Sequence, residues 1–145
     1  MDKAVIGLNK FISKLDDNNY ITLVTFDHKM RYIIKSSKIL FINKITKSMF
    51  EVGYSTLLYD TISNVVKDFL DSNINTQVHI ITDGNDTCSK TSKEEIEYIC
   101  KEMKKRKNWN ITYYNPLNID FKINNIKNIT YNLDDIDNLL GNMEI

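Results

Sequence analysis

The sequence predicts an α/β domain of three layers, in which a mostly parallel sheet with one antiparallel strand is covered by helices on both faces. Runs rich in β-branched and aromatic residues alternate with segments whose apolar residues recur at helical spacing. The dense run at residues 20–26 is typical of a strand buried on both faces, as in parallel sheets. With one proline, four glycines and no repeat or linker, residues 1–145 form one domain.

The first predicted elements are a helix and a strand pair. Apolar residues within 4–15 recur at helical spacing and predict an amphipathic helix. The turn-forming residues 16–19 end this helix, and the strand at 20–26 follows. A short turn at 27–29 leads to a second strand over 30–34, which we expect to run antiparallel to the first.

The rest of the chain alternates between strands and helices. In order, we expect a helix over 57–70, a strand over 78–81, a helix capped by Thr91 or Ser92, strands over 109–114 and 129–133, and a helix from Asp134 or Asp135. Glu94 and Glu95 stand near the position that completes a capping box. Alternation of this kind keeps the strands parallel and places helices on both faces.

Composition and charge exclude several classes of protein. Nineteen basic residues balance nineteen acidic ones, so no global field selects nucleic acid or a membrane surface. No apolar run approaches the ~20 residues of a membrane span. Two cysteines are too few for a disulfide framework or a thiolate zinc site. We therefore expect a cytoplasmic protein whose partners include neither nucleic acid nor a membrane.

Three polar clusters follow predicted strands or precede a helix: residues 27–28, 53–56 and 83–87. Ligands gather at the carboxyl ends of parallel strands, where these clusters fall. Their carboxylates and hydroxyls are ligands suited to a hard cation such as Mg²⁺. Each cluster also has a purely structural interpretation, because Asp-Gly is a common turn and Ser-Thr an ordinary helix cap.

Three segments together resemble a known family. Residues 53–62 read Gly-Tyr-Ser-Thr-Leu-Leu-Tyr-Asp-Thr-Ile, residues 78–89 contain a strand that ends in Thr-Asp-Gly, and residues 21–27 read Ile-Thr-Leu-Val-Thr-Phe-Asp. These segments are similar to the corresponding ones of von Willebrand factor A (vWA) domains. The order of elements in 93–109 resembles the cytosolic microbial and viral branch. The resemblance implies a Rossmann-like sandwich that acts as a protein-interaction module and not as an enzyme.

Members of this family hold Mg²⁺ or Mn²⁺ in a metal-ion-dependent adhesion site, to which the partner contributes a carboxylate. By resemblance, Thr56 and Asp83 are metal ligands here, with Asp27 as a weaker candidate. The same resemblance places four residues on the partner-binding rim around the metal: Tyr54, Ser55, Asn85 and Asp86.

The chain departs from the family at the first strand. The Asp-x-Ser-x-Ser motif occurs nowhere in the sequence, and the strand that carries it in the family is absent. We therefore expect Mg²⁺ or Mn²⁺ to bind weakly to this chain alone. In the family that strand lies at the centre of the sheet, so strands 20–26 and 78–82 must either pair directly or leave a groove. An upstream segment or a second copy, in a homo-oligomer, would fill such a groove.

Two alternative functions remain open at this stage. One is a small Mg²⁺-dependent hydrolase or nuclease that uses Asp27, Asp83 and Asp86. Such an enzyme also needs a general base or a phosphate-binding cation, and only His28 and Lys29 stand near these loops. The other alternative is a truncated remnant that binds no ligand.

Four further features are best explained structurally. His79 lies inside an apolar strand, where a hydrogen-bonded histidine of the core is expected. Cys100 falls on the apolar stripe of a helix, whereas Cys88 follows Thr-Asp-Gly in a loop and would be reactive only beside an activating base. The basic run at residues 101–107 fits a solvated helix end, with phosphate contact as the alternative.

Overall fold

A computed structural model describes residues 2–50, 55–71, 73–82, 86–117 and 122–143 of the chain. Along the chain the elements are α1 (Asp2–Ser13), β1 (Tyr20–Phe26), β2 (Met30–Lys38), η1 (Ile39–Phe41), η2 (Lys47–Met49), α2 (Leu58–Phe69), β3 (Thr76–Ile81), α3 (Lys93–Lys104), β4 (Trp109–Pro116), β5 (Lys127–Tyr131), η3 (Leu133–Asp135) and α4 (Ile136–Gly141). No helix within these residues is long and apolar enough to cross a membrane.

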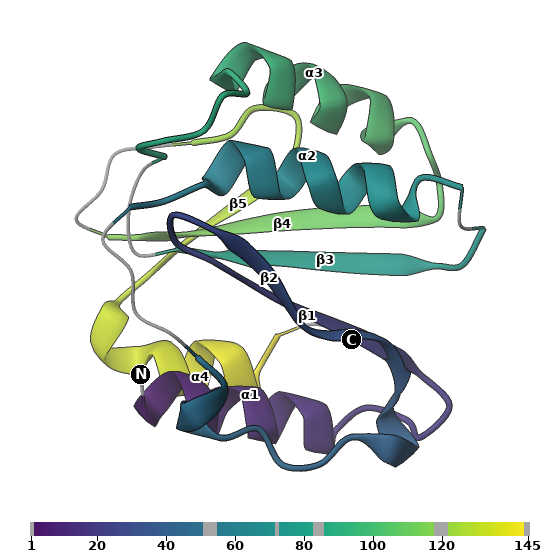
Figure 1. The fold of residues 1–145 in the computed structure, drawn as a ribbon, viewed down its shortest axis with the longest axis vertical. Coiled ribbons are helices and arrows are strands. Elements are labelled where there is room, and N and C mark those ends of the chain that lie inside the picture. The colour runs from purple at the N-terminus through teal and green to yellow at the C-terminus, as the bar shows by residue number, and fades with distance from the viewer. Residues whose placement is uncertain (1, 51–54, 72, 83–85, 118–121, 144–145) are drawn as a thin grey trace.

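The molecule is a three-layer α/β sandwich (Figure 1). Strands β3, β4 and β5 form a parallel sheet, and β1 and β2 form an antiparallel pair. Helices α2 and α3 lie on one side of the strands, and α1 and α4 lie on the other (Figure 1). This arrangement confirms the predicted fold class, including helices on both faces and one antiparallel strand.

The strands do not form one continuous sheet. Within the described residues, β1 is hydrogen-bonded to β2 alone and β3 to β4 alone, so the structure holds two sheets rather than one. Direct pairing of strands 20–26 and 78–82, one of the two outcomes expected from the sequence, is therefore not found. Each of the two strands keeps one edge without a strand partner in the described part of the chain.

Two apolar clusters fill the space on either side of the parallel sheet. The cluster beneath α2 and α3 includes Leu58, Ile96 and Tyr113, each of them fully buried. The second cluster lies against α1 and α4 and is centred on Tyr114 and Leu140. Alternate residues of β4 thus face opposite helical layers, as expected for a strand covered on both sides.

Helices α1 and α4 approach each other closely at Gly7. A Cβ atom at this position would lie 2.6 Å from the Cβ of Leu140 and 2.8 Å from the backbone oxygen of Asp137. Any side chain larger than hydrogen would therefore push the two helices apart. The single glycine of α1 is explained by this contact.

Burial along the inner strands departs from the sequence prediction in part. Strands buried on both faces would leave Leu23, Val24, Ile80 and Ile81 nearly inaccessible, and Ile80 is, with 7 % of its surface exposed. The other three are only half-buried. All of β1 after Tyr20 is half-buried because this strand has a neighbour on one edge only.

Candidate functional site

Three loops meet at the carboxyl ends of β1 and β3, and we refer to residues 27–29, 55–57 and 86–91 as the rim. The backbone N–H of Leu57 donates to the carbonyl oxygen of Asp27 at 2.8 Å, which ties the end of β1 to the start of α2. The backbone N–H of Thr56 donates to Oγ1 of Thr87 at 2.8 Å, and the N–H of Thr87 donates back to the carbonyl of Thr56 at 3.0 Å. The loops are therefore fixed to one another through backbone hydrogen bonds.

Asp86 supplies a cap to α2 from outside the helix. Its Oδ1 accepts the backbone N–H of Tyr59 at 3.1 Å, and its Oδ2 accepts that of Ser89 at 3.2 Å. The residue in the N-cap position, Leu57, has no side chain that can accept such a bond. A carboxylate beside the first turn also interacts favourably with the helix dipole.

Asp60 fixes the same loop from the helix side. Its two carboxylate oxygens accept the backbone N–H groups of Lys90 and Thr91 at 3.0 and 2.9 Å, and its own N–H donates to Oγ of Ser89 at 2.9 Å. Burial disfavours the ionised form, but the hydrogen bonds from Thr91 and Lys90 outweigh it and lower the pKa of Asp60. The charged carboxylate is thus part of the loop's structure.

Asp27 is held by its own hairpin. The side chain is buried, its Oδ1 accepts the backbone N–H of Lys29 at 2.8 Å, and Nη1 of Arg31 lies 3.4 Å from its Oδ2. The Lys29 N–H is the largest cause of a lowered pKa for Asp27, with Arg31 and His28 contributing. His28 itself is exposed, with its Nδ1 3.2 Å from the same carboxylate.

The structure brings some of the predicted site residues together. Asp27, Ser55, Thr56 and Asp86 all belong to the rim, and the first three reach it from β1 and from the segment before α2. Tyr54, Asp83 and Asn85 lie outside the described residues. Sequence reasoning missed the roles of Asp60, Thr87 and Ser89, since a hydrogen bond between loops about 30 residues apart leaves no local sequence pattern.

The described donors do not by themselves build a metal site. Both oxygens of Asp86 already accept backbone N–H groups, and Asp27 is engaged by Lys29 and Arg31. In the part of the chain that the structure describes, no three His, Cys, Asp or Glu side chains are grouped so as to hold a metal ion. Thr56 is the remaining described candidate ligand, and the fit is incomplete without further donors.

His79, Cys100 and Ser92 have the structural roles that the sequence assigned to them, although His79 is half-buried rather than buried. Nδ1 of His79 lies 3.0 Å from the hydroxyl of Tyr114, and the ring packs edge-on against Phe11. Cys100 is fully buried, and burial raises the pKa of its thiol to about 11. Cys88 is an exposed free cysteine. Ser92 caps α3 in a full capping box with Glu95.

Comparison with known proteins shows the fold. No family model matches the chain, and no curated protein matches it. Among solved structures, the chain is similar to the ArnB paralog VWA2 from Sulfolobus acidocaldarius, with a TM-score of 0.71 and 16 % sequence identity. The match covers 97 % of this chain but 39 % of that one, so the chain spans well under half of the protein it resembles. This likeness, together with the layers described above, shows that the chain has the α/β sandwich fold of a vWA domain.

Proposed function

We propose that the chain is a protein-interaction module that binds its partner, in the cytoplasm, at the rim. The observation that carries the proposal is the set of backbone hydrogen bonds that fixes residues 27, 56–57 and 86–87 to one another before any partner arrives. A surface that is already ordered loses less conformational entropy on binding, which favours recognition. The vWA-like fold supports the same interpretation by resemblance.

The metal has a secondary part in this proposal. By resemblance, Thr56 and Asp83, with Asp27 as a weaker candidate, would hold Mg²⁺ or Mn²⁺, and a carboxylate of the partner would complete the ligand set. The ion when bound supplies a positive charge that attracts this carboxylate. Because the described carboxylates are already engaged, we expect the partner to provide most of the binding energy.

Catalysis has less support at the same place. A hydrolase that used Asp27, Asp83 and Asp86 would need carboxylates directed at a metal and a substrate. Asp86 instead accepts two backbone N–H groups, and Asp27 accepts one from its own turn. These bonds favour a structural role for both groups.

The exposed cysteine provides a test at the rim itself. A thiol-specific photo-crosslinker will attach to Cys88, because Cys100 is inaccessible and its raised pKa keeps the thiol protonated. Introduced into lysate of the source cell, the labelled chain is expected to form a discrete adduct with one protein. The matched control is Cys88→Ser with Tyr98→Cys, which moves the label to an exposed position on α3.

Once the crosslinked protein has been identified and purified, its affinity for variants of the chain can be measured. Lys90→Glu changes the charge of the rim, whereas Lys101→Glu makes the same change on α3, and both side chains are exposed. We expect the first variant to weaken binding by about tenfold or more and the second by less than about twofold. The same adducts from positions 88 and 98, or equal effects of the two substitutions, would contradict a binding site at the rim.

A further inference from the structure

A pocket lies at the end of the parallel sheet opposite to the rim. Its volume is about 630 Å³, within the range of small-molecule sites. Strand β5 begins to pair with β4 only at Thr112, so residues 109–111 of β4 have β3 on one side and no strand on the other within the described residues. The end of α3 and the segment before β5 surround this short stretch, and we call the space the α3 pocket.

The α3 pocket is lined by cations. Lys104, Arg106 and Lys107 reach it from the end of α3, and Lys127 reaches it from the first residue of β5. None of the described residues that line it is acidic. Nη1 of Arg106 is hydrogen-bonded to the carbonyl oxygen of Leu70, which positions the guanidinium without neutralising its charge. Lys104, Arg106 and Lys107 place three positive charges at one cavity whose described lining contains no carboxylate, which favours an anionic ligand.

Only some of the basic residues in the run 101–107 line the α3 pocket. Lys105 points elsewhere and pairs with Glu102 at 3.0 Å, and neither Lys105 nor Lys101 lines the pocket. The pocket is thus lined by Lys104, Arg106 and Lys107 but not by Lys101 and Lys105. This division supplies a matched control on the same segment.

Part of the pocket wall is apolar, and a buried donor without a hydrogen-bond partner in the described structure belongs to it. Met103, Trp109 and Ile126 contribute to the lining, together with amide side chains such as that of Asn110. Trp109 is 4 % exposed, and its indole N–H has no hydrogen-bond partner in the described structure. This N–H is itself inaccessible, so Trp109 lies behind the pocket wall as a reporter and not as a contact for the ligand.

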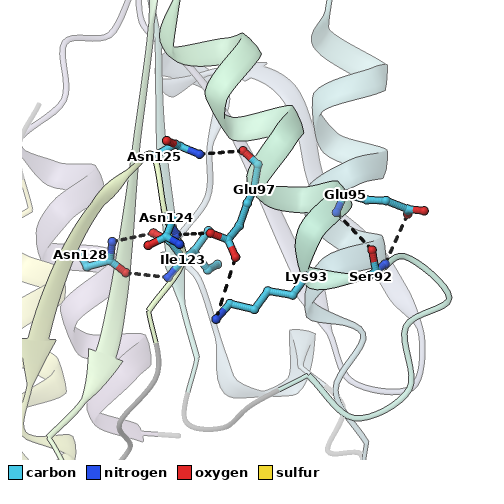
Figure 2. A network of polar contacts seen from close by, with 8 residues as sticks. All are labelled: Ser92, Lys93, Glu95, Glu97, Ile123, Asn124, Asn125 and Asn128. Atoms are coloured by element: carbon cyan, nitrogen blue, oxygen red, sulfur yellow. Dashed lines mark hydrogen bonds and ion pairs between the residues drawn. The ribbon is translucent and has the colours of Figure 1, made fainter.

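The segment that closes the pocket is held rigidly. The carboxylate of Glu97 on α3 accepts a hydrogen bond from the backbone N–H of Asn124 at 3.2 Å (Figure 2). The backbone carbonyl of Glu97 accepts one from the side-chain amide of Asn125 at 3.1 Å. The side chain of Asn128 accepts from the N–H of Ile123 and donates to its carbonyl, which fixes the turn (Figure 2). Asn125 has a φ of 72°, a conformation in which asparagine is favoured. The pocket is thus formed in advance of any ligand.

We propose that the α3 pocket binds a phosphate ester of the size of a mononucleotide. The cations at the end of α3 would contact the phosphate groups, and the half-buried side chains of Ile111 and Ile126 would contact the flat apolar part of the ligand. Amide side chains at the edge can pair with polar groups of a base. The α3 pocket is separate from the rim, so a ligand bound there would not occupy the surface that binds the partner.

Trp109 makes the proposal directly measurable. It is the only tryptophan of the chain and lines the pocket, so its fluorescence reports on occupancy. We expect ADP and pyrophosphate to change the emission saturably, ADP at lower concentration, and adenosine to leave it unchanged. Calorimetry on the same samples checks each affinity. Raising the salt concentration should weaken both interactions, because they depend on charge.

Paired substitutions locate the binding. Lys104→Gln with Lys107→Gln should weaken ADP binding by about tenfold or more, whereas Lys101→Gln with Lys105→Gln removes the same charge and should change it by less than about twofold. The proposal is overturned if neither ADP nor pyrophosphate binds at low millimolar concentration, or if adenosine binds as well as ADP. Equal losses in the two paired variants, or saturable binding of single-stranded RNA without binding of ADP, would overturn it as well.

Discussion

The carboxylate of Asp86 accepts the backbone N–H of Tyr59 at 3.1 Å, although 27 residues separate the two in the sequence. This bond joins the loop after β3 to the first turn of α2. The Leu57 N–H joins the same helix to the carbonyl of Asp27 at the end of β1. Helix α2 thereby connects two strands that are not hydrogen-bonded to each other. The rim therefore spans two separate sheets and is held together by α2.

Removing the cap should destabilise the fold. Asp86→Ala leaves the N–H of Tyr59 without its acceptor and is expected to cost about 0.5–2 kcal/mol of unfolding free energy. Urea denaturation measures this cost, with Asp17→Asn in the exposed turn before β1 as the control for loss of charge. Asp86→Asn keeps one acceptor and should lie between wild type and Asp86→Ala. An Asp86→Ala variant as stable as wild type would show that the cap contributes nothing.

Stability should decrease in acid through Asp60. Its pKa is lowered from 3.8 in the folded chain, so the stabilisation is complete above about pH 4 and is lost as the pH falls through the folded-state pKa. Melting temperatures between about pH 6 and pH 2 should fall steeply for wild type. Asp60→Asn cannot titrate and should give a shallower acid decrease, whereas Asp17→Asn should keep the wild-type slope. Parallel acid profiles for wild type and Asp60→Asn would be inconsistent with the bonds to Lys90 and Thr91.

The two inner strands should differ in their sensitivity to truncation. Ile80 is 7 % exposed and packs in the cluster beneath α2 and α3, so Ile80→Ala should cost about 2–5 kcal/mol. Leu23 is only half-buried on β1, and Leu23→Ala should cost roughly 1–2 kcal/mol. Chemical denaturation of both variants checks the difference. A larger loss for Leu23→Ala would mean that β1 is covered in solution by something absent from the structure.

Divalent metal should have little effect on the isolated chain. Stabilisation by a ligand grows with its concentration relative to the dissociation constant, and the described donors of the rim form an incomplete set. Millimolar Mg²⁺ or Mn²⁺ should therefore shift the melting temperature by less than about 1 °C relative to a chelator. A rise of several degrees that disappears in Asp83→Ala would instead show a competent site.

Much of the fold follows from local patterns in the sequence. The strand predicted at 20–26 has these bounds in the structure, and the helix predicted over 57–70 spans Leu58–Phe69. Ser92 and Glu95 form the expected capping box because its two hydrogen bonds involve residues only three apart. Hydrophobic periodicity and capping are local properties, so a single sequence suffices to read them.

The separation of the sheets and the contacts of the rim could not be read in this way. Leu23 is half-buried because β1 has a strand neighbour on one edge only. The sequence of β1 itself does not indicate how many neighbours the strand has. In the sequence Asp86 has the features of a candidate metal ligand, because the same residue type in a loop can either bind a metal or cap a helix. Only the fold shows that the backbone N–H of Tyr59 is its partner.

Amide hydrogen exchange, followed residue by residue, tests whether β1 and β3 belong to two separate sheets. Residues along a strand direct their backbone groups alternately to its two edges, so a strand with one neighbour protects every second amide. We predict alternating protection along β1 and β3, each of which has one edge without a strand partner in the described structure, and continuous protection at 112–115 of β4, which is paired on both sides. Continuous protection along β1 and β3 would mean instead that the two sheets are joined and that the rim does not span two separate sheets.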